Sequence, residues 1–279
     1  MKSFRSVPIA FLTILLIAGA AIASTTGKDK SDSGFMNRLL DRLSKDQLAV
    51  VDLSHVLNSK TPDFFGDHDI YHFEHKTLVR DDGYSTGTFQ TPEHFGTHVD
   101  APVHFVKGSE PLDQISVKRL VVPAVVIDMR KQVETNPDCA LTESMIQDWE
   151  KEYGRIPDNA AVLLLTGWSK RWDSEQQYRN PDSKNQMHFP SYLEDAVKFL
   201  IEKRKVNAIG VDTLSIDPGV TTTYPVHKIT AQSNVYGIEN LNNLDQLPAK
   251  GILLVCGPLA LEGGTGCPAR VVAIIDRAN

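Results

Sequence analysis

The densest group of side chains able to do chemistry lies in residues 94–105, which read HFGTHVDAPVHF. This stretch holds three histidines and one aspartate, namely His94, His98, Asp100 and His104. Imidazole nitrogens and carboxylate oxygens are common ligands of Zn²⁺, and imidazole also exchanges protons near neutral pH. The stretch is therefore either a metal site that works on a substrate or a half-exposed strand whose histidines only form hydrogen bonds.

Residue spacing decides between a helix and an extended chain here. His94 and His98 stand four apart, as they would on one face of a helix, but Gly96 and Pro102 are poor helix residues. In an extended chain, the even-numbered residues from 94 to 104 share one face and the apolar residues take the other. Three histidines and a carboxylate on a single face favour the metal site over the half-exposed strand.

Two bends are needed to gather these side chains. On a straight strand His98 and Asp100 lie ~7 Å apart at Cα, close enough to hold one ion, whereas His94 is too distant. Gly96 permits a bend or bulge that would bring His94 in. Pro102 cannot donate a ladder hydrogen bond, so it redirects the chain before His104.

The rest of the chain predicts one α/β domain over residues 48–279, with a central mixed β-sheet flanked by helices. Short apolar runs edged by Gly, Pro or Asp indicate buried strands at 48–54, 124–129, 161–167, 207–213, 251–257 and 270–276. A helix is expected over 142–153, capped by Thr142. A second helix is expected over 191–204, where Ser191 and Glu194 have capping-box spacing.

The N-terminus predicts export. Lys2 and Arg5 precede an uncharged apolar run that ends in Ala21-Ile22-Ala23, which is typical of a signal peptide over residues 1–23. The alternative is an uncleaved anchor, because the run approaches the ~20 residues that span a bilayer. Residues 24–47 are polar and predict a flexible tail followed by a short amphipathic helix. We expect a protein that is secreted or held in the secretory-pathway lumen.

Charge, hydropathy and cysteine content limit the classes of binding partner and the disulfides that we expect. With 29 basic and 35 acidic residues, the chain has a formal net charge of −6, which argues against nucleic acid or an anionic membrane surface as partner. No comparable apolar run follows the signal segment, so no membrane association is expected after cleavage. Three cysteines allow at most one disulfide, and Cys256 and Cys267 are the better candidates because they could face each other across adjacent strands. The sequence leaves open whether the protein is a homo-oligomer.

The stretch at 94–105 resembles the H-x-G-T-H-x-D-x-P-x-H signature of the metal-dependent cyclase family, which includes bacterial-type kynurenine formamidases and isatin hydrolases. The resemblance extends over most of the mature chain. It includes DLSH at 52–55, VDTLSID at 211–217, GIEN at 237–240 and the closing GGTGCPARVVAI. It implies a swivelling β/β/α-like fold.

The resemblance also implies roles for single residues. It makes His94, His98 and Asp100 ligands of Zn²⁺ or Mn²⁺, with one ion or two. His104 would be the catalytic acid/base rather than a ligand. His227 and Glu239 would complete the second-metal or outer shell, whereas the residues alone would suggest two solvent-facing loop positions.

The expected reaction is hydrolysis of a C–N amide bond in a small aromatic amide. The family points to N-formylkynurenine, the arylformamidase reaction preferred here, or alternatively to isatin-like lactam opening. Phe64 and Phe65 are expected to hold the aromatic ring, and Trp168 either to join them or to pack elsewhere. The loop TPDFFGD at 61–67 departs from the family's Pro-x-Trp-Pro-Gly-Asp, which leaves pocket width and substrate open. A secreted, non-catalytic binding protein on the same fold is the alternative from another class.

Overall fold

The computed structural model describes residues 30–67 and 69–277, so the predicted signal peptide at 1–23 lies outside the described residues. The chain divides into two units, residues 1–44 and 45–279. In the first unit the described part is helix α1 (Lys30–Ser44), which matches the helix predicted within 24–47. Over the described residues, no helix combines the length and the apolar character needed to cross a bilayer.

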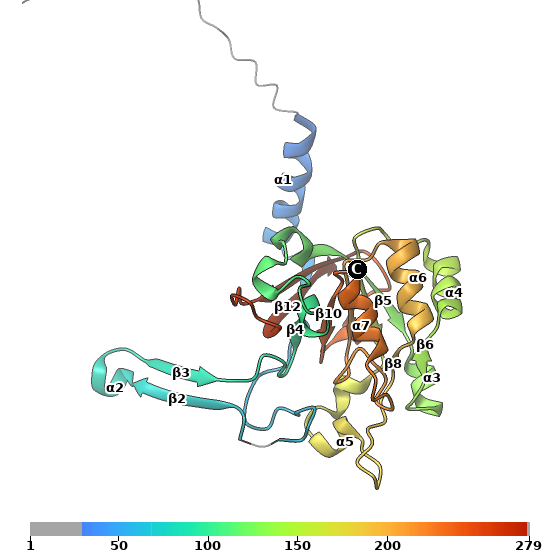
Figure 1. Ribbon diagram of the computed structural model, residues 1–279. Helices are drawn as coiled ribbons and strands as arrows, with labels where there is room; N and C mark the ends of the chain where they lie inside the picture. The colour runs from blue at the N-terminus through green and yellow to red at the C-terminus, as the bar shows by residue number, and fades with distance from the viewer. Residues whose placement is uncertain (1–29, 68, 278–279) are drawn as a thin grey trace, which may run out of the picture. The chain divides into compact units, whose positions relative to one another are not determined.

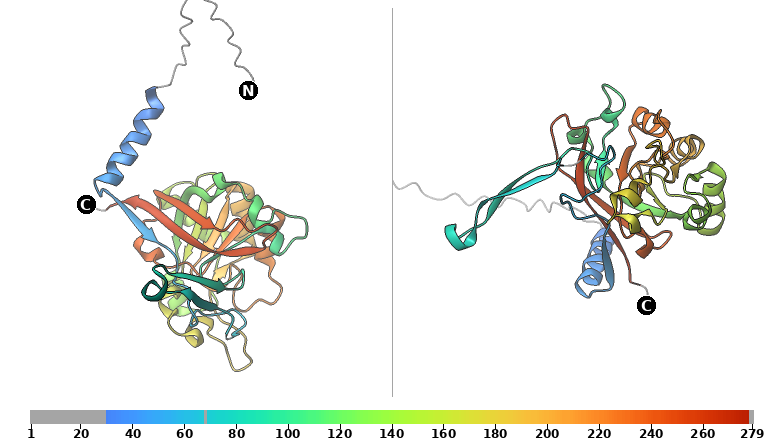
Figure 2. Two further views of the ribbon diagram at one scale, coloured as in Figure 1. Left: turned by 90° about the vertical axis from the view of Figure 1, so that its left-hand side faces the viewer. Right: turned by 90° about the horizontal axis from the view of Figure 1, so that it is seen from below.

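The second unit is built on one mixed sheet that closes into a barrel (Figures 1 and 2). Its strands lie in the order β1 (Leu48–Asp52), β12 (Gly266–Asp276), β11 (Ile252–Pro258), β5 (Val121–Asp128), β7 (Ala161–Leu165), β9 (Ala208–Val211), β10 (Tyr236–Glu239) and β4 (His98–Asp100). Because β4 also pairs with β12, seven strands form the barrel and β1 extends the sheet beyond β12. Strands β5, β7, β9 and β10 are parallel, and the other pairings are antiparallel.

Alternation along the strands produces two cores. On β7, Leu163 belongs to the core inside the barrel, while Val162 and Leu164 belong to a second core on its outer side. Helices α4 (Glu143–Tyr153) and α6 (Glu194–Arg204) contribute apolar side chains to this outer core. Together with α3 (Arg130–Thr135) and α7 (Pro225–Gln232) they flank the barrel (Figure 1). The predicted mixed sheet with flanking helices is confirmed.

Of the two predicted helix caps, one is present and one is absent. The Thr142 side chain accepts a hydrogen bond from the Met145 amide and caps α4, as predicted. The predicted capping box at Ser191 is wrong, because Ser191 and Tyr192 form strand β8 (Ser191–Tyr192), which pairs with β6 (Ala140–Leu141). The Ser191 hydroxyl instead donates to the Ser215 carbonyl, and α6 begins only at Glu194.

The cysteines are not bridged. Cys256 lies opposite Val271, and Cys267 lies opposite Val99, so the two residues are out of register on β11 and β12. Both thiols are buried and free, and Cys139 is also free.

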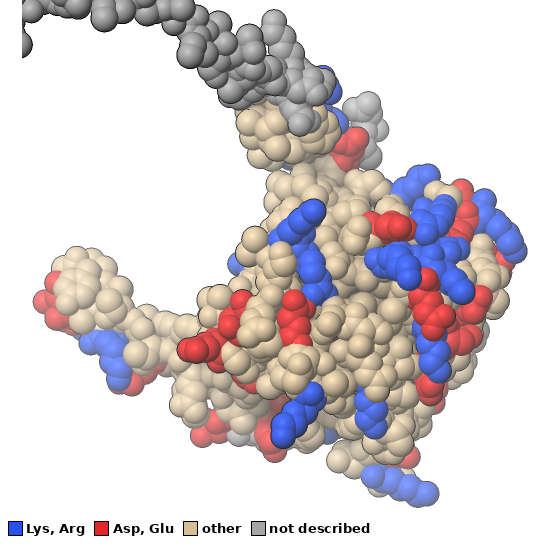
Figure 3. Space-filling view, turned by 45° about the horizontal axis from the view of Figure 1, so that its top comes forward, with Lys and Arg blue, Asp and Glu red and all other residues tan. Residues whose placement is uncertain are grey.

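A hairpin arm projects from the barrel (Figure 1). It consists of β2 (His72–Thr77), α2 (Val79–Asp82) and β3 (Thr86–Gln90). Shorter elements complete the unit: α5 (Glu175–Arg179) and 3₁₀ turns at Pro102–His104, Leu112–Gln114, Val117–Leu120, Trp168–Arg171 and Leu244–Gln246. On the face shown in Figure 3, Lys and Arg are interspersed with Asp and Glu.

Candidate metal centre

Two side chains of strand β4 that could bind a metal point away from the barrel interior. Val99 is fully buried in the interior core, so His98 and Asp100 on either side of it point outward. Strand β10 pairs with β4 in a register that sets Glu239 opposite His98 and Gly237 opposite Asp100. Three polar side chains therefore meet on the outer surface of two neighbouring strands, and all three are buried.

Both predicted bends are present. Gly96 has a φ of +62°, and a Cβ there would lie 2.1 Å from Leu57 Cδ2, so both conformation and space require glycine. This bend brings His94 Nδ1 to 2.6 Å from Asp100 Oδ1. Pro102 then begins the 3₁₀ turn Pro102–His104, and the His104 ring stacks on the His94 ring at a centroid distance of 3.9 Å.

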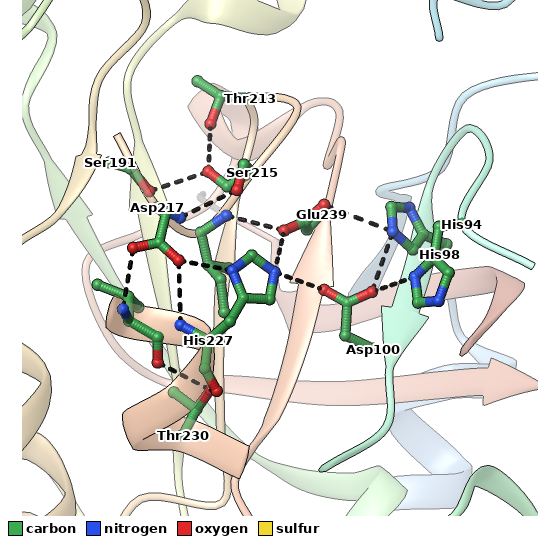
Figure 4. Close-up of polar contacts among 12 residues, drawn as sticks. His94, His98, Asp100, Ser191, Thr213, Ser215, Asp217, His227, Thr230 and Glu239 are labelled. Carbon is green, nitrogen blue, oxygen red and sulfur yellow. Dashed lines mark hydrogen bonds and ion pairs between the residues drawn. The ribbon is translucent and has the colours of Figure 1, made fainter. Parts of the chain in front are cut away.

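Helix α7 supplies the last member of the cluster. His227 Nε2 lies 3.4 Å from Asp100 Oδ2 and 3.2 Å from Glu239 Oε1 (Figure 4). On the other side, His98 Nε2 lies 3.2 Å from Asp100 Oδ1 and 3.4 Å from Glu239 Oε2. His227 and Glu239 are both buried, so the interpretation from residues alone, which left them as solvent-facing loop positions, is wrong.

Hydrogen bonds behind His98 and His227 determine which ring nitrogen faces the cluster. His98 Nδ1 lies 2.9 Å from the Gly96 carbonyl, which can only accept, so Nδ1 carries the proton. His227 Nδ1 lies 2.6 Å from Asp217 Oδ2, a carboxylate that also only accepts. In each neutral ring, the Nε2 lone pair therefore points at Asp100 and Glu239.

A chain of hydrogen bonds through Thr265 and Glu93 orients the His94 ring. The Thr265 hydroxyl donates its single proton to the Glu93 carboxylate, so its oxygen must accept from His94 Nε2 at 3.0 Å. The neutral His94 ring then turns a bare Nδ1 toward Asp100 Oδ1. Two acceptors at 2.6 Å repel one another unless a proton or a metal cation lies between them.

The pKa values follow from this excess of acceptors. Burial disfavours the charged ring of His98, but Asp100, Glu239 and the Gly96 carbonyl together outweigh it and raise the His98 pKa to about 9. The pKa of His227 is likewise raised well above its usual value, because bonds to Asp100, Asp217 and Glu239 overcome burial. Burial and the neighbouring Asp100 raise the pKa of Glu239. Without a metal, protons must supply the positive charge that this cluster demands.

The donor set fits one or two divalent cations. His98 Nε2 and Asp100 Oδ2 are buried and form no hydrogen bond, which is costly unless a further partner binds them. Ligand atoms of His98, Asp100 and Glu239 lie within 4.8 Å of one another, and so do those of His94, Asp100 and His104. Nitrogen and oxygen donors in these proportions suit Zn²⁺ or Mn²⁺.

The cluster forms the floor of a cavity of about 430 Å³. Phe64, Phe65, Phe105 and Tyr224 contribute aromatic wall, and His104 stands exposed beside them. Although part of its surface is exposed, desolvation of the ring by the groups packed around it, together with the nearby His94, His227 and His98, lowers the His104 pKa to about 4, so its ring is neutral at pH 7. A neutral imidazole next to an electrophilic centre can accept a proton.

Trp168 does not line this cavity. It is fully buried in a small core with Tyr178, Phe189 and Leu214, and its Nε1 donates to the Tyr178 carbonyl at 2.7 Å. Of the two expectations for Trp168, the structure shows packing, and assigning it to the substrate wall needs correction. Its contribution is indirect, because Phe64 and Leu214 both pack in its core and both line the cavity.

Sequence reasoning missed several residues around the cluster. Glu93, Thr265, Phe105 and Tyr224 all contact site residues or line the cavity, yet none stands at ligand spacing. Thr265 lies in GGTG at 263–266, which reads as a simple turn. The signal in the sequence that could have found Thr265 is the run of small residues around it. A Cβ at Gly266 would lie 2.4 Å from His94 Cε1, so β12 needs a residue without a side chain where it packs against His94.

Comparison with known proteins agrees with this geometry. A putative cyclase family matches residues 51–218, more than half of the chain. The chain belongs to the cyclase family. This cyclase-family hydrolase is 37% identical over 194 residues to an isatin hydrolase from Roseibium aggregatum, covering 67% of this chain and 73% of the relative. It is 24% identical to a kynurenine formamidase from Salinibacter ruber, over 81% of this chain and 97% of that protein.

A solved structure extends the comparison to the fold. Isatin hydrolase A from Ralstonia solanacearum superposes with a TM-score of 0.81 at 34% identity, covering 86% of this chain and 97% of that one. The barrel and its flanking helices are therefore those of cyclase-family hydrolases.

Proposed function

We propose that this cyclase-family hydrolase opens the amide bond of a small, neutral aromatic amide, an isatin-type lactam. One observation carries the proposal: a buried cluster of lone pairs that requires a cation forms the floor of a cavity with aromatic walls. A bound divalent ion polarises a carbonyl and lowers the pKa of water, while aromatic side chains hold a flat ring. The similarity to isatin hydrolases supports the same choice.

The charge of the cavity favours a neutral substrate. Among the described residues that line it there is no lysine or arginine, whereas Asp63, Asp67 and Glu93 lie on its wall. N-formylkynurenine carries an α-ammonium group and an α-carboxylate, and the carboxylate would find no lysine or arginine among these lining residues and would lie close to their carboxylates. Isatin carries no charge before its ring opens. Because of this difference in substrate charge, we propose lactam opening, although the sequence alone led us to prefer the arylformamidase reaction.

The protein's own residues have separate tasks in the reaction. The Asp63 carboxylate accepts from the Phe65 and Asp67 amides at 2.8 and 3.1 Å, a turn that fixes Phe64 and Phe65 on the cavity wall. His104 takes a proton from the attacking water and delivers it to the amide nitrogen as the C–N bond breaks. One water is consumed, and the product carries an aryl amine and a carboxylic acid, which releases one proton to solvent to become a carboxylate.

A formanilide-type substrate is the second candidate. It shares the aromatic ring and the C–N bond to be broken, and the kynurenine formamidase relative supports it. It differs in its leaving group, because formate departs from the amine instead of remaining tethered to it.

A panel of three substrates tests the proposal. We expect metal-loaded protein to hydrolyse isatin with the highest kcat/KM, unsubstituted formanilide less well, and a carboxylate-bearing formanilide least. His98→Ala protein serves as the control and should hydrolyse none of them. Metal-loaded protein that binds isatin without opening it would overturn the proposal in favour of a non-catalytic binding protein.

We also propose, on sequence grounds alone, that the protein is exported after cleavage near Ser24. N-terminal sequencing of protein made in its own cells tests this. A product that keeps Met1 in the cytosol would refute it.

A further inference from the structure

Asp217 lies directly behind His227 and does not itself line the substrate cavity. It is 1% exposed and stands in the loop that joins β9 to α7. Its Oδ1 accepts from the Val226 amide at 2.9 Å. Its Oδ2 accepts from the His227 amide at 3.1 Å and from His227 Nδ1 at 2.6 Å (Figure 4).

The first two of these bonds belong to the helix. Val226 and His227 lie in the first turn of α7, where amide groups have no partner within the helix, and a carboxylate there also meets the positive end of the helix dipole. The residue before the helix, Tyr224, makes no side-chain cap. Asp217 therefore caps α7 from seven residues before that position.

The third bond has no role in capping. It forces the proton of His227 onto Nδ1 and aims Nε2 at Asp100 and Glu239. The same loop fixes Glu239 as well, since the Ile216 amide donates to Glu239 Oε1 at 2.8 Å. One loop thus orients two members of the cluster, from two different elements.

We propose that Asp217 is a positioning residue of the metal centre: its carboxylate fixes the tautomer and direction of His227 and so determines how tightly the His227 side of the centre holds a divalent ion. Carboxylate partners behind metal-binding histidines commonly have this effect. The inference rests on the metal site of the proposed function but not on its substrate.

Asp212 provides a matched control. It too is fully buried, lies at the end of β9 and accepts three hydrogen bonds, from the Thr166 amide at 3.0 Å, the Thr166 hydroxyl at 2.5 Å and the Gly167 amide at 2.9 Å. None of these partners is in the cluster. Removing either carboxylate should disturb packing, but only Asp217 should affect the metal.

The test measures Zn²⁺ affinity by competition with a chromophoric chelator. Asp217→Ala should weaken binding by about 10–100-fold. Asp217→Asn should weaken it less, because its amide oxygen can still accept from His227 while its charge is lost. Asp212→Asn should leave the affinity at the wild-type value. In Zn²⁺-loaded wild-type protein, the His227 Nδ1 proton should give a slowly exchanging NMR signal that Asp217→Ala abolishes.

A double-mutant cycle separates positioning from general destabilisation. In a His227→Ala background, Asp217→Ala should cause no further loss of Zn²⁺ affinity. If Asp217→Ala lowers affinity as much without His227 as with it, or if Asp212→Asn lowers it equally, Asp217 is only a structural cap and the proposal is wrong. A metal site that binds no Zn²⁺ even in wild-type protein would instead refute the proposed function.

Discussion

Strands β4 and β7 belong to the same barrel and are buried along their whole length, yet their outward-facing residues differ: those of β7 are apolar and those of β4 are polar. On β7, Val162 and Leu164 point outward into an apolar core covered by α4 and α6. On β4, His98 and Asp100 point outward against Glu239 and His227. Inward, both strands supply the same kind of side chain, Leu163 and Val99. The barrel interior is thus the common scaffold, and the outward positions decide between packing and chemistry.

The two outer surfaces also differ in what stabilises them. Apolar burial around β7 is favourable by itself, at roughly 25 cal/mol per Å². Burial of imidazoles and carboxylates around β4 is unfavourable unless their charges and lone pairs are matched. A divalent cation supplies that match, so the β4 surface should depend on metal and the β7 surface should not.

The largest expected effect comes from Asp100→Ala. Asp100 lies within ion-pair distance of His94, His98 and His227, so its loss removes the carboxylate shared by all three. We expect metal binding and amide hydrolysis to fall to background, checked by metal analysis and by isatin turnover. Circular dichroism should still show the fold. A variant that keeps its metal would mean that Asp100 is not a ligand.

His104→Ala should have the next largest effect. If His104 transfers protons, amide hydrolysis should fall by ~10²–10⁴-fold, mainly in kcat. An activated ester, whose leaving group needs no proton, should lose less. Ligand atoms of His104, His94 and Asp100 lie close enough to share an ion. His104→Ala protein purified without metal would therefore make His104 a ligand and contradict its assignment as acid/base.

On the apolar side, Leu164→Ala should lower the free energy of unfolding by about 2–5 kcal/mol, because Leu164 is fully buried. Chemical denaturation measures this. The Zn²⁺ affinity of the folded variant should equal that of wild-type protein. A shared loss of stability and metal affinity would show that the two surfaces are coupled and would break the comparison.

The last effect expected is a graded change of metal affinity with pH. In metal-free protein His98 has a pKa of about 9, so below that pH a metal must displace its proton. Metal affinity should therefore rise as pH increases from 6 toward 9, by about tenfold per pH unit for each displaced proton. The His98 contribution should level off above about 9. Zn²⁺ titrations at several pH values test this, and an affinity independent of pH between 6 and 9 would contradict the histidine assignment.

The sequence predicted those parts of the molecule whose cause is local. Gly96 and Pro102 bend the chain on either side of β4, and both bends follow from the residues themselves. The apolar runs of β7 and β9 likewise predict buried strands. Thr142 caps α4 through a residue three positions away, a distance that sequence patterns cover.

The features that sequence reasoning missed depend on distant pairings. Ser191 has the spacing of a cap, but pairing of β8 with β6 and a bond to the Ser215 carbonyl override it. Thr265 lies 171 residues from His94, and only the pairing of β12 with β4 brings them together. Trp168 follows a strand end as a pocket residue would, yet it packs beneath the cavity wall. Family resemblance, rather than spacing, indicated His227 and Glu239.

Crystals grown with Zn²⁺ test the central claim most directly, through an anomalous difference map recorded at the zinc edge. The account predicts a strong peak on the outer side of β4 and β10, roughly 2.0–2.2 Å from His98 Nε2 and from an oxygen of Asp100 or Glu239. A second peak beside His94 or His227 would mean two ions. A map with no peak at this cluster, from crystals whose Zn²⁺ lies elsewhere on the protein, would contradict the claim that these outward-facing residues form a metal centre.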